Sequence, residues 1–323
     1  MSRILTLALA TLMTTSAAVK IEKTAWNGWP NCYRISNGEV DLIVTSDIGP
    51  RIMSYGFAGG QNFLWVQKET AGKNGEPAWV ARGGHRIWVG PEDVKYTYPP
   101  DNSPVKVEIR GDVLIATQPV EKETGVEKQL EIRLAASGTG VTIVHRLKNT
   151  GVMPLEYAAW ALSMMAPGGR GVTGFPPRGT HPEMLQPTNP LVMWAFSDVS
   201  DPRWTITKKY LMLQHVPGNA TPTKLGHHNP KTWGAYFLNG QMFLKRYDAA
   251  PTPASHPDFG CSYETFTNAD FLEIETLGPL QKVQGGAAVE HVERWSLLRD
   301  AKPAAWTDAE LDRILLPVLA SDK

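Results

Sequence analysis

Two alternating segments in the middle of the chain decide the fold class: Leu130-Glu-Ile-Arg-Leu134 and, after Ser137-Gly-Thr-Gly140, Val141-Thr-Ile-Val-His-Arg-Leu147. In the first, apolar residues alternate with charged ones. In the second, His145 shares the alternating positions with three apolar residues. A period of two is typical of a strand with one buried face, and the glycine-containing stretch between the segments is typical of a turn. The two segments therefore predict an antiparallel β-hairpin.

The same pattern recurs on both sides of this hairpin. Further short segments combine alternating or β-branched residues with Gly, Asn or Asp turns. Strands this frequent predict an all-β fold, a large antiparallel β-sandwich. The segments predicted in this way are Glu39 to Thr45, Phe63 to Val66, Val105 to Ile109 and Val113 to Ile115 around Gly111-Asp112, and Trp233 to Phe237 and Met242 to Arg246 around Asn239-Gly240.

One segment near the end of the chain is predicted to be a short C-terminal helix. Thr307-Asp-Ala-Glu310 has the spacing of a capping box, and apolar residues from Leu311 to Val318 follow at helical spacing. Pro317 is expected to end or kink this helix, because proline lacks a backbone N–H.

The charge balance of the chain does not favour a polyanionic partner. The chain has 323 residues, with 32 Lys or Arg against 32 Asp or Glu. This balance gives no electrostatic reason to expect a nucleic acid or an anionic membrane as a partner. The 11 Trp, 9 Tyr and 9 Phe supply ample apolar surface, so a disordered chain is not expected.

Residues 1–18 have the pattern of a secretory signal peptide. Arg3 precedes a short apolar run, and small residues end at Ala18 as in a cleavage site. The run is too short to span a bilayer. We therefore expect residues 19–323 to form a single domain that is periplasmic or secreted.

Standard catalytic and metal-binding motifs are missing from the sequence. It contains no nucleophile elbow, phosphate loop, HExxH or dinucleotide fingerprint. His215, His227 and His228 are close in sequence, but neighbours on a strand point to opposite faces, which favours a polar loop over a metal site. No metal or cofactor is predicted. Cys32 and Cys261 can either pair in an oxidising compartment or remain buried free thiols.

Two short regions have the composition of a sugar site. Gly83-Gly84-His85-Arg86-Ile87-Trp88 brings together an imidazole, a guanidinium and an indole. An indole can stack on the C–H face of a sugar, and a guanidinium can bind neighbouring hydroxyls. The alternative, a core Trp88 beside an ion-paired Arg86, is equally compatible with the pattern.

The second region carries three glutamates among apolar and aromatic residues. They are Glu264, Glu273 and Glu275. Glu273 and Glu275 share one face of a predicted strand. That face is either exposed to solvent or part of a polar cleft, where carboxylates can act as general bases or hold hydroxyls.

The chain resembles the aldose 1-epimerase, or galactose mutarotase-like, superfamily, and most closely a bacterial branch of it. The resemblance covers nearly all of residues 19–323. It begins at Asn37-Gly-Glu-Val-Asp-Leu-Ile-Val-Thr-Ser-Asp-Ile-Gly-Pro-Arg-Ile52, continues through Gly60-Gln-Asn-Phe-Leu-Trp65 and ends at Glu293-Arg-Trp-Ser-Leu297. It implies a β-supersandwich whose concave face holds a sugar.

The resemblance also implies residue roles. Gly84-His85-Arg86-Ile87 is similar to the strand that carries an Asn-Arg pair in mutarotases, with Arg86 retained and His85 in the place of Asn. Gly260-Cys-Ser-Tyr-Glu264-Thr265 is similar to the segment that carries their catalytic base, which implies that Glu264 takes up a proton.

The acid of the family has no counterpart at the matching position. The segment that carries the acid histidine in mutarotases leads here from Pro154 to Trp160. Because an indole cannot act as a general acid, the acid would have to be His85, His227 or His228.

These observations predict a carbohydrate-binding protein, and an aldose 1-epimerase-like isomerase if it is catalytic. The alternatives are a non-catalytic saccharide-binding module, and lyase or epimerase chemistry on a uronic acid held by Arg86 or Lys245. A carbohydrate ligand is the expected partner, and the sequence does not indicate an oligomeric state. The predicted catalytic residues are Glu264 and His85, and the predicted substrate-binding residues are Arg86, Trp88, Trp160, Lys245, Glu273 and Glu275.

Overall fold

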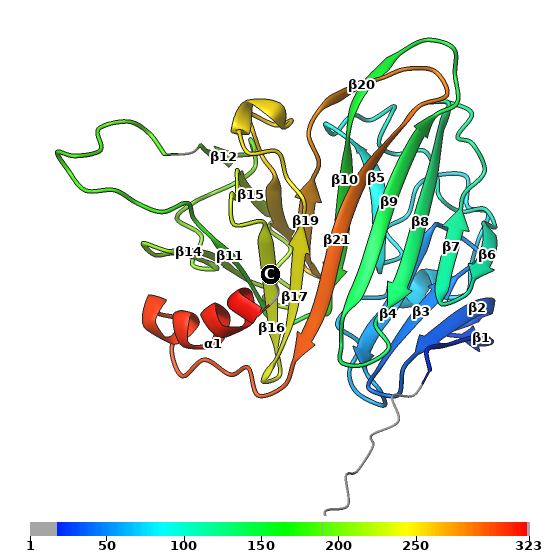
Figure 1. Cartoon of the computed structure of the whole chain (residues 1–323), viewed down its shortest axis with the longest axis horizontal. Helices are drawn as coiled ribbons and strands as arrows, with labels where there is room; N and C mark the ends of the chain where they lie inside the picture. Colours follow the sequence, from blue (N-terminus) through cyan, green and yellow to red (C-terminus); the bar gives the residue numbers. More distant parts are fainter. Residues whose placement is uncertain (1–17, 189, 322–323) are drawn as a thin grey trace, which may run out of the picture.

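The computed structural model describes residues 18–188 and 190–321. The predicted signal peptide lies almost entirely outside the described residues, so this interpretation remains a prediction. The strands of the described chain form two large antiparallel sheets, of eleven and ten strands (Figure 1). This arrangement confirms the predicted all-β sandwich.

The eleven-stranded sheet contains the strands that matter for the site. Its order is β1-β2-β3-β4-β5-β10-β19-β18-β15-β12, and β20 pairs with the far end of β10. Its strands are β1 (Lys20–Trp26), β2 (Trp29–Ser36), β3 (Val40–Thr45), β4 (Arg51–Phe57), β5 (His85–Gly90), β10 (Leu155–Met165), β12 (Leu191–Met193), β15 (Thr223–His227), β18 (Tyr263–Thr267), β19 (Leu272–Leu277) and β20 (Gln281–Val283).

The ten-stranded sheet packs against it in the order β13-β14-β11-β16-β17-β21-β9-β8-β7-β6. A shared apolar core unites the two sheets, with Ile87 and Ile274 from the first and Ile132 and Phe243 from the second. Its strands are β6 (Lys106–Arg110), β7 (Val113–Thr117), β8 (Val126–Leu134), β9 (Val141–Asn149), β11 (Arg170–Gly174), β13 (Trp204–Ile206), β14 (Tyr210–Gln214), β16 (Trp233–Leu238), β17 (Gln241–Tyr247) and β21 (Ala288–Leu298).

The three predicted hairpins form where expected. In β8 and β9, Leu130 pairs with His145 and Ile132 with Ile143. Strands β6 and β7 form the second hairpin, and strands β16 and β17 form the third. Asn239 and Gly240 have φ values of 50° and 77°, as the tight turn between β16 and β17 requires.

The prediction of a strand over residues 63–66 is wrong. Leu64 and Val66 each make only an isolated bridge, to Met165 and to Gly83 respectively. The backbone hydrogen bonds of this segment are divided among Tyr55 of β4, the end of β10 and residues 82–84. Because the segment passes from one partner to the next, it forms a continuous ladder with none of them.

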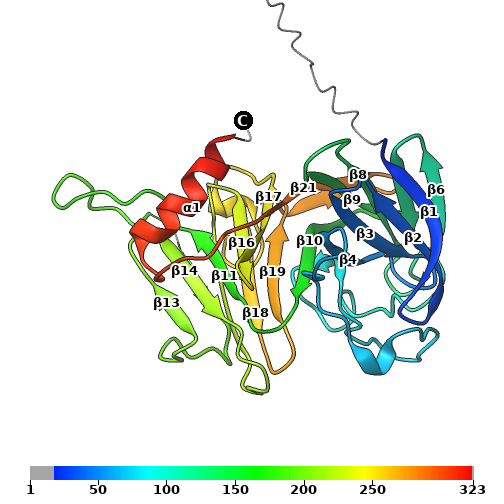
Figure 2. The same cartoon turned by 90° about the horizontal axis from the view of Figure 1, so that it is seen from below.

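The C-terminal helix α1 (Asp308–Ser321) covers the outside of the ten-stranded sheet (Figure 2). Its buried residues Leu311, Ile314 and Leu315 pack against side chains of β14, β16 and β17. Of the two expected effects of Pro317, ending or kinking the helix, the first does not occur, because helix α1 continues through Pro317. Pro317 is exposed, which lets water bond the carbonyl that loses its partner.

The sequence left open whether the two cysteines form a disulfide. Cys32 and Cys261 are buried free thiols, so the unpaired alternative is the one that the structure contains.

Among the described residues there is no helix with the length and apolarity needed to cross a membrane.

Candidate functional site

The strand register divides the predicted site residues between two faces of the eleven-stranded sheet. The side chains of Ile87 and Ile274 point into the core shared with the second sheet, whereas Trp88 and Trp160 form a separate apolar cluster on the opposite face. We call that opposite face the outer face. Since alternate residues of a strand share a face, Arg86 lies with Trp88 on the outer face, and His85 lies with Ile87 in the core.

Neighbouring strands extend the outer face toward the carboxylates. In the ladders, Leu162 of β10 pairs with both Arg86 and Glu275, and Met164 pairs with Glu273. Glu275 in turn pairs with Glu264 on β18. The structure therefore brings together six predicted residues on one face: Arg86, Trp88, Trp160, Glu264, Glu273 and Glu275.

The predicted roles of His85 and Lys245 do not fit their positions. Both side chains are fully buried between the sheets, and both lie beside Glu293 of β21. His85 therefore cannot act as the acid opposite Glu264, because the backbone of the sheet separates them. Lys245 cannot hold a substrate on the outer face for the same reason. His227 also faces inward, against the rings of Phe175 and Tyr263.

We call the buried residues His85, His145, Lys245 and Glu293 the interior cluster. Its histidines form a directional chain of hydrogen bonds. Nδ1 of His145 lies 2.8 Å from the carbonyl oxygen of His291, so it must carry the proton. The Nε2 atoms of His145 and His85 are 2.7 Å apart, which makes His85 the donor. The hydroxyl of Ser163 then donates to Nδ1 of His85 over 2.8 Å.

A buried ion pair completes the interior cluster. Nζ of Lys245 lies 2.9 Å from Oε1 of Glu293, and Trp295 donates its indole N–H to Oε2 over 2.8 Å. The ligand atoms of His85, His145 and Glu293 lie within 4.8 Å of one another, a spacing compatible with a metal ion. The hydrogen bonds and the neighbouring ammonium already account for this arrangement, which we interpret as structural.

Lys224, which the sequence analysis missed, is the centre of the outer-face site. Its Nζ lies 2.6 Å from Oε2 of Glu264 and 2.9 Å from Oε2 of Glu275. The same atom lies 4.6 Å from the ring centroid of Trp160 and 4.6 Å from that of Trp194. Two carboxylates and two indole rings therefore hold one buried cation in place.

Arg86 holds the other end of the site. Its guanidinium lies 4.0 Å from the ring centroid of Trp88 and 3.6 Å from Oε1 of Glu273. The same guanidinium lies 5.3 Å from the ring centroid of Trp79. We call Arg86, Lys224, Glu264, Glu273 and Glu275 together the outer-face cluster.

Several polar atoms of the outer-face cluster lack a hydrogen-bond partner although they are buried. They are Nε of Arg86 and the Oε1 atoms of Glu264, Glu273 and Glu275. Leaving a buried polar atom unpaired costs about 1–3 kcal/mol. A site that binds hydroxyl groups explains why these atoms are kept.

A pocket of about 580 Å³ lies against this cluster. Its lining residue Trp194 contacts Lys224, and its lining residue Tyr98 packs 5.0 Å from the ring of Trp88. Asp258, also in the lining, raises the pKa of Glu264. The full lining comprises Glu92, Asp93, Val94, Tyr98, Trp194 and Asp258.

The pKa values of the outer-face cluster are set mainly by burial. Burial raises the pKa of Glu264 well above its usual value, helped by Glu275 and opposed by Lys224. Burial and Glu275 also raise the pKa of Glu273 to about 7, against the effect of Arg86. Burial disfavours the charge of Lys224, but its two carboxylate partners outweigh burial and raise its pKa. Glu264 is thus a strong base when ionised, and Glu273 is a carboxylic acid that titrates near neutral pH.

Replacing Glu273 with glutamine is expected to change the pH dependence of stability. The folded wild type holds a proton on Glu273 up to about pH 7, whereas an ordinary glutamate releases it near pH 4.5. The stabilisation from this proton is therefore present below pH 4.5 and lost as the pH rises to 7. Between pH 5 and 7 the free energy of unfolding of the variant should rise by about 2 kcal/mol relative to wild type. Urea unfolding at the two pH values measures this change. If the difference in unfolding free energy between variant and wild type is the same at both pH values, the raised pKa of Glu273 is incorrect.

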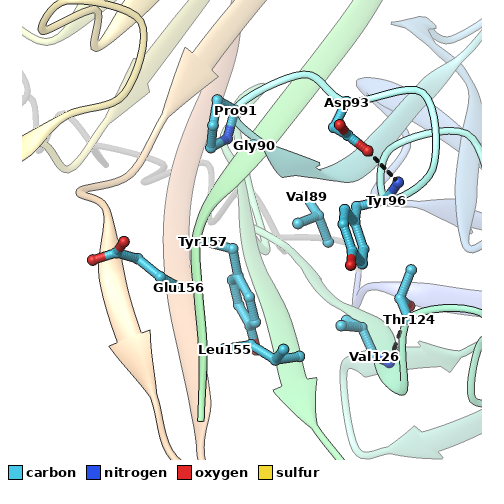
Figure 3. A pocket seen from close by; sticks show the side chains of 10 residues that line it. All are labelled: Val89, Gly90, Pro91, Asp93, Tyr96, Thr124, Val126, Leu155, Glu156 and Tyr157. Carbon is cyan, nitrogen blue, oxygen red and sulfur yellow. Dashed lines mark hydrogen bonds between the residues drawn. The ribbon is translucent and has the colours of Figure 1, made fainter.

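Figure 3 shows the residues that line a second pocket, of about 200 Å³. Val89 of β5, Val126 of β8 and Tyr157 of β10 line it, and Asp93 lines both pockets. Trp194, in the lining of the larger pocket, contacts Lys224 of the outer-face cluster. We therefore place the candidate site at the larger pocket.

Comparisons with known proteins agree with this architecture. No protein-family profile matches the chain, and no curated protein matches it significantly. Among solved structures it is similar to a candidate aldose 1-epimerase from Klebsiella pneumoniae, with a TM-score of 0.58 and 12% identity over 93% of this chain and 87% of that one.

Two further similar structures are galactose mutarotase-like proteins. The one from Clostridium acetobutylicum has a TM-score of 0.53 and 9% identity, and the alignment covers 87% of this chain and 99% of that one. The one from Lactobacillus casei has a TM-score of 0.51 and 11% identity, over 83% of this chain and 100% of that one. The chain therefore has the galactose mutarotase-like fold, as its sequence resemblance implied.

Proposed function

We propose that the outer-face cluster binds a saccharide and promotes interconversion of its anomers. The observation that carries this proposal is the set of buried polar atoms of Arg86, Glu273 and Glu275 that lack a hydrogen bond, beside an aromatic-lined pocket. Hydroxyl groups of a sugar would pair with these atoms, and indole rings would pack on its C–H face. The similar solved structures support a sugar-related site of this fold.

Glu264 is the proposed base. Opening of an aldopyranose requires removal of the proton on the anomeric hydroxyl while the ring oxygen gains one. The raised pKa of Glu264 makes its carboxylate a stronger base than an exposed glutamate. Lys224 holds this carboxylate in one orientation through the 2.6 Å ion pair.

Glu273 is the proposed acid. It lies diagonally across the β18–β19 ladder from Glu264, on the same face. Its pKa of about 7 leaves a substantial protonated fraction at neutral pH, and about 10% of its side chain is exposed. A pair of carboxyl groups with different pKa values can divide the roles of base and acid. Glu273 would thus supply the proton that the indole of Trp160 cannot.

A non-catalytic saccharide-binding module is the second candidate. Trp160 favours it, because the indole N–H donates to Oε2 of Glu275 over 2.9 Å at the position where the resemblance leads to a catalytic histidine. In this case the same atoms would bind the sugar without proton transfer.

Exchange NMR spectroscopy on a panel of aldoses distinguishes the two candidates. The catalytic proposal predicts that the wild-type protein accelerates α/β interconversion over buffer at equal pH. Sugar binding without acceleration would leave the binding module as the function. If no member of a panel covering the common hexoses and pentoses binds or reacts, the proposed saccharide site is contradicted.

A further inference from the structure

The pocket and the cluster beneath it carry a surplus of carboxyl groups. The described lining of the pocket contains three acidic residues and neither Lys nor Arg. The cluster adds three carboxyl groups and two cations. Even with two of the glutamates protonated, negative charges outnumber positive ones. The acidic residues are Glu92, Asp93, Asp258, Glu264, Glu273 and Glu275, and the cations are Arg86 and Lys224.

The two cations are already engaged by the protein. Lys224 contacts two carboxylates at 2.6 and 2.9 Å, and two indole rings flank it. Arg86 lies over Trp88 and beside Glu273. An anionic ligand would therefore meet cations whose charge is neutralised at short range, behind a rim of carboxylates.

The acidic surplus is joined to a built binding surface. The carboxylates of Glu273 and Glu275 are at least nine-tenths buried, and each has an Oε1 without a hydrogen-bond partner. On the rim, Trp194 and Tyr98 place aromatic rings beside Glu92 and Asp258. Carboxylates combined with aromatic rings favour an ammonium group through charge-assisted hydrogen bonds and cation–π attraction.

We propose that this pocket selects an amino sugar, a saccharide with a protonated amine, and rejects uronic acids and sugar phosphates. The inference rests on the proposed function, because it specifies the class of saccharide that the same site takes. The ammonium would lie at the rim near Glu92 and Asp258, while the ring hydroxyls meet the unpartnered atoms below. A uronic acid would bring a seventh carboxylate to this site, which weighs against the uronate alternative.

Isothermal titration at pH 7 with matched sugars tests the selection. The probes are glucosamine, N-acetylglucosamine, glucose and glucuronate, together with the corresponding galactose series, which separates charge from ring stereochemistry. We expect the amine to bind at least about 10-fold more tightly than the uronate of the same series, with the neutral sugars between them. Added salt should narrow the difference, since it screens the charges.

Two variants locate the source of the selection. The double variant Glu92→Gln with Asp258→Asn should reduce the preference for the amine over the uronate from at least about 10-fold to less than about threefold. Asp112→Asn removes an exposed carboxylate from the turn between β6 and β7 and should leave the preference unchanged. Circular dichroism of each variant verifies that it is folded.

The outcomes separate this inference from the function on which it rests. Binding of neutral sugars with equal or tighter binding of the uronate would overturn the amino-sugar selection and leave the saccharide site intact. A preference for the amine that survives in the double variant would overturn the assignment to the rim. If no probe binds, the proposed function fails and the inference fails with it.

Discussion

Replacing Glu264 with glutamine is expected to slow anomer interconversion by at least about 100-fold, because general base catalysis typically contributes 10²–10⁴-fold. Sugar affinity should change by less than about tenfold, since the amide keeps the size and can still bond a hydroxyl. The fold should persist, because Lys224 retains its 2.9 Å ion pair with Glu275. Exchange spectroscopy gives the rate, and titration gives the affinity.

The pH dependence of this rate provides an independent check. Glu264 must be ionised to accept a proton, and its pKa is raised by burial. The wild-type rate should therefore rise with pH through an apparent pKa above 4.5, as Glu264 ionises, and fall again above about pH 7, as Glu273 loses the proton that it supplies as the acid. A Glu264→Gln variant with the wild-type rate and the same pH profile would contradict the role of Glu264 as base. Glu290→Gln, an exposed substitution on β21, is the matched control.

Replacing Glu293 with glutamine is expected to lower the free energy of unfolding by about 3–5 kcal/mol, because it leaves a buried charge without its partner. Lys245 is fully buried, and burial already lowers its pKa. If Lys245 instead releases its proton at pH 7, the free energy lost is about 5 kcal/mol. The expected loss of unfolding free energy is therefore similar whether Lys245 stays charged or releases its proton. Urea or guanidinium unfolding measures it.

The double variant Lys245→Met with Glu293→Gln separates charge from packing. It removes both charges, while the glutamine can still accept from the indole of Trp295. Replacing a buried ion pair by neutral groups of similar size is often close to neutral in stability. We therefore expect the double variant to recover most of the loss. If the single variant stays within 1 kcal/mol of wild type, the buried ion pair of Lys245 with Glu293 does not stabilise the fold as expected.

Short-range patterns predicted most of the fold. The hairpin of β8 and β9 shows period-two alternation over both strands, and Asn239-Gly240 is a local turn signal, so neither requires knowledge of distant partners. The apolar run at residues 63–66 looks the same as a strand in sequence. Its failure to form one depends on where β10 and residues 82–84 lie, which no local pattern contains.

The candidate site was predictable only in part. Alternation alone separates His85 from Arg86, because neighbours on a strand face opposite sides of a sheet, and this signal would have removed His85 from the cleft. The position of Lys245 depends on which sheet receives β17, a long-range pairing. Lys224 stands alone in its segment, and only the pairing of β15 with β18 brings it to Glu264.

The central claim is that the unpartnered atoms of the outer-face cluster bind a saccharide. Saturation-transfer difference NMR, with irradiation of the aromatic protons and the sugar panel described above, tests it most directly. The prediction is transfer to the C–H protons of one face of the ring, strongest for the amino sugar, and loss of transfer in Trp194→Ala with Arg86→Met. The absence of transfer from the folded wild-type protein to every sugar in the panel would contradict it.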